Sequence, residues 1–172
     1  MSFLPSADEL VGRNRSYAES FDDSALEVHP TRHLALVTCM DSRIDAFQVL
    51  GLANGEAHII RNAGGVVTDD VIRSLCLSQT YLGTQEIILL HHTDCGLQNL
   101  DEAAFRADLE KLTGVKPWWS LEAFTDPYKD VRQSMVRIAM TPFIPYKDQV
   151  RGFVYDVRDG LLKEVEPAEE GC

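Results

Sequence analysis

The chain has 172 residues, with 16 Lys or Arg against 27 Asp or Glu, so its formal net charge at pH 7 is −11. A nucleic-acid-binding protein needs surplus cations to neutralise phosphates, so this balance argues against a nucleic-acid partner. No apolar run approaches 18 residues, which predicts no membrane-spanning helix. Hydrophobic residues make up 45% of the chain, as in soluble globular proteins, and the length suits one domain with a real core.

The first residues, Met1–Pro5, combine neither a basic start nor an apolar segment, so we expect no signal peptide and a cytoplasmic protein. Four cysteines lie at positions 39, 76, 95 and 172. In a reducing compartment such scattered cysteines are expected to be metal ligands or free thiols rather than disulfides.

A helix is predicted near the N-terminus. Ser6 and Glu9 have the spacing of a capping box, and apolar residues including Leu10, Tyr17 and Phe21 follow on one helical face. We expect residues 1–30 to form a helical arm and linker. The arm packs either on its own sheet or on a second subunit, and the sequence leaves both placements open.

The centre of the chain alternates between strands and helices. Strands are expected at 34–38, 57–60 and 86–91, and helices at 45–50 and from about 68 to 83. This alternation predicts an α/β fold, with a mainly parallel central sheet that has helices on both faces.

The remaining elements are expected to complete the same domain. Helices are predicted at 101–112 and 126–139, and strands at 152–157 and 161–165. The last two strands flank an Asp159-Gly160 turn, so the final strand should be antiparallel. We expect residues 1–172 to form a single domain with a flexible tail at 168–172.

Candidate metal ligands follow two of these strands. Cys39 comes directly after the strand at 34–38, and His92 and Cys95 come at the end of the strand at 86–91. Ligands gather at the carboxyl ends of parallel strands, so these side chains should converge if the two strands are neighbours. Thiolates and imidazole favour zinc, and three protein ligands with an open fourth position are typical of a catalytic zinc site. A core histidine with buried thiols is the alternative.

Three neighbouring residues need separate interpretation. His91 is the nearest rival ligand, but adjacent strand residues point to opposite faces, so only one histidine of the pair can serve. Asp41, paired with Arg43, either accepts a hydrogen bond from zinc-bound water or ligates the zinc itself. A loop salt bridge without a catalytic part is the third alternative.

The segment 61–65 (RNAGG) follows the strand at 57–60 and lacks the pattern of a phosphate-binding P-loop. We interpret it as a tight loop that walls the pocket, with Gly64 and Gly65 next to the substrate.

Three motifs together, CMDSR (39–43), RNAGG (61–65) and HTDCG (92–96), resemble those of the β-class carbonic anhydrases in sequence, order and separation. The resemblance runs to about Pro167 and is closest to the short prokaryotic branch, which includes small mycobacterial members. It implies one Zn²⁺ per subunit on Cys39, His92 and Cys95, with Asp41 and Arg43 as a catalytic dyad.

The resemblance also implies a sheet of order 2-1-3-4 extended by a fifth strand, and a homodimer or dimer of dimers. In such dimers the N-terminal helix embraces the partner. The implied reaction is reversible hydration of CO2 to bicarbonate by zinc-bound hydroxide. Hydrolysis of carbonyl sulfide (COS) or CS2 is the first alternative, because relatives of the short branch carry out that reaction. A non-catalytic zinc protein, with Asp41 as permanent fourth ligand, is the second.

Overall fold

Strands and helices alternate along the chain, as the sequence predicts. The computed structural model describes residues 5–167, so the expected tail at 168–172 and Cys172 lie outside the described residues. The strands are β1 (Leu34–Cys39), β2 (Ala57–Asn62), β3 (Glu86–His92), β4 (Val150–Tyr155) and β5 (Leu162–Val165). The helices are α1 (Ala7–Glu19), α2 (Ala46–Leu50), α3 (Asp69–Thr80), α4 (Glu102–Thr113) and α5 (Pro127–Met140), with 3₁₀ turns at Asp23–Ala25 and Ala63–Gly65.

The five strands form one sheet in the order β2-β1-β3-β4-β5. The first four strands are parallel, and β5 runs antiparallel to β4 across the predicted Asp159-Gly160 turn. The expected α/β fold and strand order are therefore confirmed. No helix within residues 5–167 is long and apolar enough to cross a bilayer.

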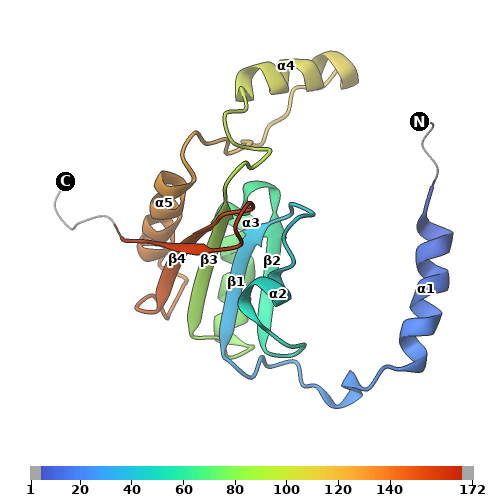
Figure 1. The fold of residues 1–172 in the computed structure, drawn as a ribbon. Helices are drawn as coiled ribbons and strands as arrows, with labels where there is room; N and C mark the ends of the chain where they lie inside the picture. Colours follow the sequence, from blue (N-terminus) through green and yellow to red (C-terminus); the bar gives the residue numbers. More distant parts are fainter. Residues whose placement is uncertain (1–4, 168–172) are drawn as a thin grey trace.

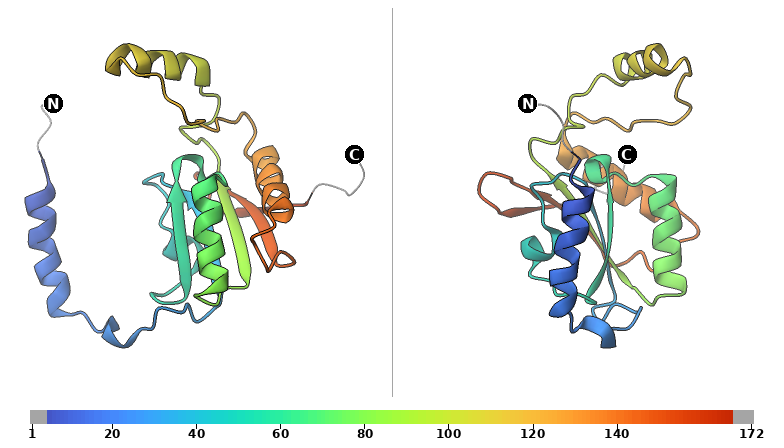
Figure 2. Two further views of the ribbon diagram at one scale, coloured as in Figure 1. Left: turned by 180° about the vertical axis from the view of Figure 1, so that it is seen from behind. Right: turned by 90° about the vertical axis from the view of Figure 1, so that its right-hand side faces the viewer.

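Helices cover both faces of the sheet. In Figures 1 and 2, α3 and α5 lie on one face, and the short α2 lies on the other. All six residues of β1 are buried, because this strand sits between β2 and β3 with packed side chains above and below. Ala35 and Val37 join the core under α3 and α5, whereas Leu36 packs under α2 with Ala46 and Leu90. Such continuous burial is typical of a central strand in a parallel sheet.

Side-chain caps fix the starts of four helices. Asp45, Thr68, Asp101 and Asp126 are the N-caps of α2, α3, α4 and α5, and each side chain accepts a backbone N–H of the first turn. These contacts satisfy donors that would otherwise lack partners at a helix start. The capping box at the N-terminus is different. Ser6 is the N-cap of α1, but its side chain makes no capping hydrogen bond in the described chain.

The α1 arm stands away from the sheet at the end of a long connection (Figures 1 and 2). None of the 13 described residues of this helix is buried. The sequence left two placements of this helix open, on its own sheet or on a second subunit. In this structure α1 does not pack on its own sheet.

The predicted bounds of β4 were wrong by two residues at each end, because Gly152 was taken to begin the strand. It instead lies inside β4, paired with Leu89 of β3 and Val165 of β5. A Cβ at this position would overlap Val131 Cγ1 and lie 3.1 Å from Met135 Sδ, both on α5. The glycine therefore allows α5 to approach the sheet closely.

We expect Gly152→Ala to lower the free energy of unfolding by about 1–3 kcal/mol, because the new methyl group would overfill the space under α5. Urea unfolding measures this change. Gly12→Ala is a suitable control, since a Cβ at Gly12 would have no neighbour within 4 Å. Equal stability of Gly152→Ala and the wild type would contradict this account of the α5 packing.

Candidate metal centre

Two strand ends bring the predicted ligands together. β1 and β3 are parallel neighbours, with Thr38 opposite Leu90, so their carboxyl ends meet at one edge of the sheet. Cys39 is the last residue of β1 and His92 the last of β3, and a short turn after β3 returns Cys95 to the same point. The metal-ligating atoms of all three buried residues lie within 4.8 Å of one another.

The imidazole of His92 is oriented for a metal. Its Nδ1 lies 2.9 Å from the carbonyl oxygen of Thr93, and a carbonyl can only accept, so Nδ1 carries the proton. Nε2 is then an acceptor, and it is buried with no hydrogen-bond partner among the described residues. An unpaired buried acceptor is costly, and this one belongs to the cluster of metal-ligating atoms. A metal ion at the cluster would satisfy it.

The two thiols affect each other. Their Sγ atoms are 3.9 Å apart. The hydrogen bond from Cys95 is the main reason that the pKa of Cys39 falls to about 4, and burial opposes this change. The same contact raises the pKa of Cys95, as does its burial. One thiol therefore holds the other as a thiolate, which is the form that binds metal, and loss of the second proton would accompany metal binding.

Asp41 and Arg43 form the predicted pair beside the cluster. Nε of Arg43 donates to Asp41 Oδ1 at 3.0 Å, and Nη2 donates to Oδ2 at 2.8 Å. These hydrogen bonds from Arg43 hold the pKa of Asp41 far below its usual range, so the carboxylate is ionised. Asp41 Oδ2 lies 3.8 Å from His92 Nε2, which is too long for a hydrogen bond. The carboxylate thus lies next to the three ligands while both of its oxygens contact Arg43.

Arg43 also contacts the other metal-binding loop. Its Nη1 donates to Asp94 Oδ2 at 2.8 Å, and its Nη2 donates to the carbonyl of Asp94 at 2.7 Å. The sequence analysis did not identify Asp94, although it lies inside the HTDCG motif. An acidic residue between two candidate ligands was the available signal, but spacing alone could not show that it reaches Arg43.

The RNAGG segment contributes to the wall of the pocket and also holds the backbone of the neighbouring loop. Arg61 donates from Nε to the carbonyl of Cys39 at 2.9 Å and from Nη2 to the carbonyl of Asp41 at 2.8 Å. The N–H of Met40 donates to the carbonyl of Asn62 at 2.8 Å. The end of β2 therefore holds the backbone of the loop that carries Cys39 and Asp41.

The two glycines of this segment have different positions. Gly64 lines a cavity beside Cys39 and Cys95, whereas Gly65 lies behind the cavity wall, where a Cβ would come within 2.9 Å of the Cys39 nitrogen. Both have a positive φ, of 79° and 73°, which glycine adopts without strain. Gly65 is needed for the close approach of the loop to β1.

The cavity at the cluster has a volume of about 320 Å³. Besides Cys39, Asp41 and Cys95, its walls are mostly apolar: Met40, Ala63, Gly64, Gly96, Leu97, Leu100 and Leu121. It therefore presents one ionised carboxylate and two of the three candidate ligands, Cys39 and Cys95, to a small apolar space.

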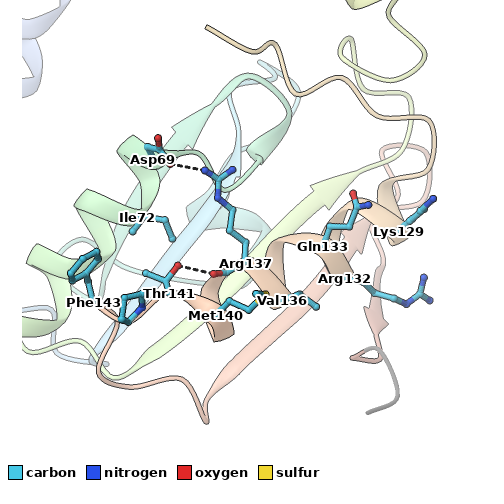
Figure 3. A pocket seen from close by; sticks show the side chains of 11 residues that line it. Asp69, Ile72, Lys129, Arg132, Gln133, Val136, Arg137, Met140, Thr141 and Phe143 are labelled. Carbon is cyan, nitrogen blue, oxygen red and sulfur yellow. Dashed lines mark hydrogen bonds and ion pairs between the residues drawn. The ribbon is translucent and has the colours of Figure 1, made fainter. Parts of the chain in front are cut away.

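A larger cavity of about 720 Å³ lies elsewhere, between α3 and α5 (Figure 3). Its lining includes Ile72, Val136 and Met140, and Arg137 at its edge is paired with Asp69 at 2.6 Å. None of the predicted site residues lines it. Its size alone does not make it the site, because the ligand cluster and the ionised pair lie at the other cavity.

His91 points away from the cluster, as the alternation of side chains along a strand predicts. Its Nε2 lies 2.7 Å from Asp130 Oδ2 on α5, and its ring lies beside that of Phe124. Of the two neighbouring histidines, only His92 is in the group of three ligands.

Comparisons with known proteins agree with this site. The family model described as carbonic anhydrase matches residues 34–126. β-Carbonic anhydrase 1 of Mycobacterium tuberculosis is 50% identical over 160 residues, which are 93% of this chain and 98% of the relative. A carbon disulfide hydrolase of Acidithiobacillus thiooxidans is 32% identical over 77% of this chain and 76% of its own.

The crystal structure of a carbonic anhydrase from Streptococcus mutans superposes with a TM-score of 0.89, at 41% identity, and covers 96% of this chain and 100% of that one. The sequence motifs, the sheet order and these matches agree, and the chain belongs to the β-class carbonic anhydrase family.

Proposed function

We propose that this protein is a zinc enzyme that catalyses the reversible hydration of CO2 to bicarbonate. The observation that carries this proposal is the buried group of Cys39, His92 and Cys95, which lies beside an ionised Asp41 at an apolar cavity. The match to β-carbonic anhydrase 1 over nearly the whole chain supports it.

The three ligands fit zinc. Two thiolates and a neutral imidazole are a usual donor set for this ion, and together they balance its charge. The unpaired Nε2 of His92 would become a ligand atom. In such a site zinc is a Lewis acid that makes water a nucleophile near neutral pH.

In this proposal Asp41 orients the reacting water, by accepting a hydrogen bond from it. Because Arg43 keeps the pKa of Asp41 far below its usual range, the carboxylate remains ionised and does not store a proton at neutral pH. Asp41 is therefore not the group that holds the proton released by the reaction. Arg43 binds both oxygens of Asp41, which fixes the direction of the carboxylate.

The cavity would hold the other reactant. CO2 is small, linear and apolar, and the walls formed by Leu97, Leu100 and Leu121 suit such a molecule. Gly64 leaves space beside the ligands, and Gly65 holds the wall close to β1. Bicarbonate is charged and gains little from apolar walls, so this lining favours its release.

A second candidate is the hydrolysis of COS or CS2. These substrates are also small, linear and apolar, so the same cavity lining suits them. A relative with 32% identity is named a carbon disulfide hydrolase, and this similarity supports the second candidate. The two candidates share the ligands and the role of Asp41, and they differ in whether sulfur takes the place of one or both oxygens of the substrate.

The non-catalytic alternative requires Asp41 to be a permanent fourth ligand. In this structure both oxygens of Asp41 contact Arg43, and the close group of ligands among the described residues has only three members. This arrangement supports a fourth position that is free for water.

We also propose that the α1 arm packs on a second copy of the chain, giving a homodimer or a dimer of dimers. Leu10, Val11 and Tyr17 of α1 are 55%, 60% and 54% exposed, and Phe21 just beyond it is 49% exposed. Burying such an apolar stripe is favourable, and the chain's own sheet does not cover it in the described structure. A second copy supplies the missing cover.

The reaction is tested by a paired assay on zinc-loaded and zinc-stripped protein. CO2 hydration is followed by stopped-flow pH change, and COS loss is followed by headspace gas analysis. We expect fast CO2 hydration and little COS turnover by the zinc-loaded protein, with both lost on stripping. Efficient COS turnover with slow CO2 hydration would assign the protein to the second candidate, and the absence of both would refute the proposal.

Asp41→Asn should lower kcat for CO2 hydration by a factor of about 10² or more, because the water would lose its ionised acceptor, while zinc stays bound. Metal analysis and stopped-flow kinetics measure the two effects. Asp45→Asn is the matched control, since it removes a charge from the same loop and asparagine also caps helices. Unchanged kcat in Asp41→Asn would contradict the proposed role of Asp41. Loss of zinc from this variant would favour the non-catalytic alternative, in which Asp41 is the fourth ligand.

The double substitution Leu10→Asp, Tyr17→Asp should convert the wild-type dimer or tetramer into monomers near the chain mass of 19.2 kDa. Light scattering after size-exclusion chromatography measures this change. Ser16→Asp adds a charge to the opposite side of the same helix and should leave the oligomer intact. A monomeric wild type, or one unchanged mass for all variants, would contradict the arm proposal.

A further inference from the structure

Arg43 is shared by two carboxylates that come from different loops. Asp41, after β1, receives its Nε and one hydrogen of Nη2. Asp94, after β3, receives its Nη1 through the side chain and its Nη2 through the backbone carbonyl. One guanidinium therefore joins the loop of Cys39 to the loop of His92 and Cys95.

The backbone conformation of Asp94 suggests that its side chain is present for the contact with Arg43. Its φ is 56°, in the left-handed region that glycine occupies without strain and most other residues avoid. Aspartate tolerates this region better than most residues, but a turn of this shape alone would favour glycine. The hydrogen bond made by the Asp94 carboxylate goes to Arg43. The shape of the turn therefore does not explain the presence of an aspartate at position 94, whereas the hydrogen bond to Arg43 does.

We propose that Asp94 is a positioning residue that holds the guanidinium of Arg43 with its Nε–Nη2 edge facing Asp41. The proposal rests on the role of the Asp41–Arg43 pair given above. Asp41 takes Nε and Nη2 of Arg43, whose side chain is 45% exposed, so without the Asp94 carboxylate Nη1 would face water. Asp94 binds Nη1, the nitrogen that Asp41 does not use. The side chain of Asp94 is 70% exposed, so this contact contributes orientation rather than much stability.

Two variants separate orientation from the shape of the turn. Asp94→Asn keeps the size of the side chain and tolerates a positive φ, and Asp94→Gly removes the side chain and fits the backbone best. We expect kcat/KM for CO2 hydration to fall about three- to tenfold in Asp94→Gly and less in Asp94→Asn, which retains a neutral acceptor. Zinc content and the thermal midpoint should be those of the wild type in both variants.

A second readout follows Arg43 directly and does not depend on activity. In the wild type the two Nη groups should give separate ¹⁵N signals by NMR, because the contacts with Asp41 and Asp94 block rotation of the guanidinium. In Asp94→Gly these signals should merge or broaden. Arg43→Lys assigns them by their disappearance. If the wild type failed to hydrate CO2, the proposed function would fail while these signals would still test the position of Arg43.

Glu164→Gln is the matched control. Glu164 on β5 pairs with Arg151 through both carboxylate oxygens, at 2.7 and 2.8 Å, at the far edge of the sheet. This variant should change neither kcat/KM nor the Arg43 signals. Unchanged kcat/KM and unchanged signals in Asp94→Gly would overturn the proposal. Loss of zinc and a lower thermal midpoint in both Asp94 variants would overturn it too, because Asp94 would then only shape the turn.

Discussion

The parallel pairing of β1 with β3 is the constraint on which the metal centre depends. All residues of β1 are buried, and its register with β3 sets Thr38 opposite Leu90. This pairing is stabilised by apolar packing on both faces of the sheet. Because the ligands follow the last paired residues, a change of register would separate Cys39 from His92 and would also turn His92 to the face that His91 now occupies.

The second constraint is the placement of two arginine side chains, Arg43 and Arg61, beside the site. Arg43 binds carboxylates through its side chain, whereas Arg61 binds two backbone carbonyls of the same loop. The two arginines therefore do different things. Arg61 fixes where the loop lies, and Arg43 fixes the charge and direction of Asp41. The pair of contacts from Arg61 joins β2 to this loop, so all three of the strands β2, β1 and β3 contribute to one site.

Much of this structure could be predicted because its signals are local. Caps such as Thr68 and Asp126 act on neighbouring backbone groups, and the apolar runs of β1 and β3 need no partner to be recognised. The misses came from contacts between distant segments. Gly152 was taken as the first residue of its strand, because the closeness of α5, which makes a glycine necessary inside β4, is not encoded near it. Arg61 and Asp94 act on residues about 20 and 50 positions away, and no spacing rule connects them to those partners.

The same distinction applies to the choice of substrate. In the proposed reaction the three candidate ligands and the Asp41–Arg43 pair act on water and charge, and they come from the motifs that the sequence displays. The apolar wall of the cavity comes only partly from those motifs: Met40, Ala63, Gly64 and Gly96 belong to them, whereas Leu97 and Leu100 precede α4 and Leu121 follows it. COS and CS2 have one or both oxygens of CO2 replaced by the larger sulfur atom without a change in net charge, so the space between these apolar side chains can help to discriminate among the three molecules. We therefore expect substrate selectivity to depend on how the α4 segment leaves and rejoins the sheet as well as on the motif residues of the wall.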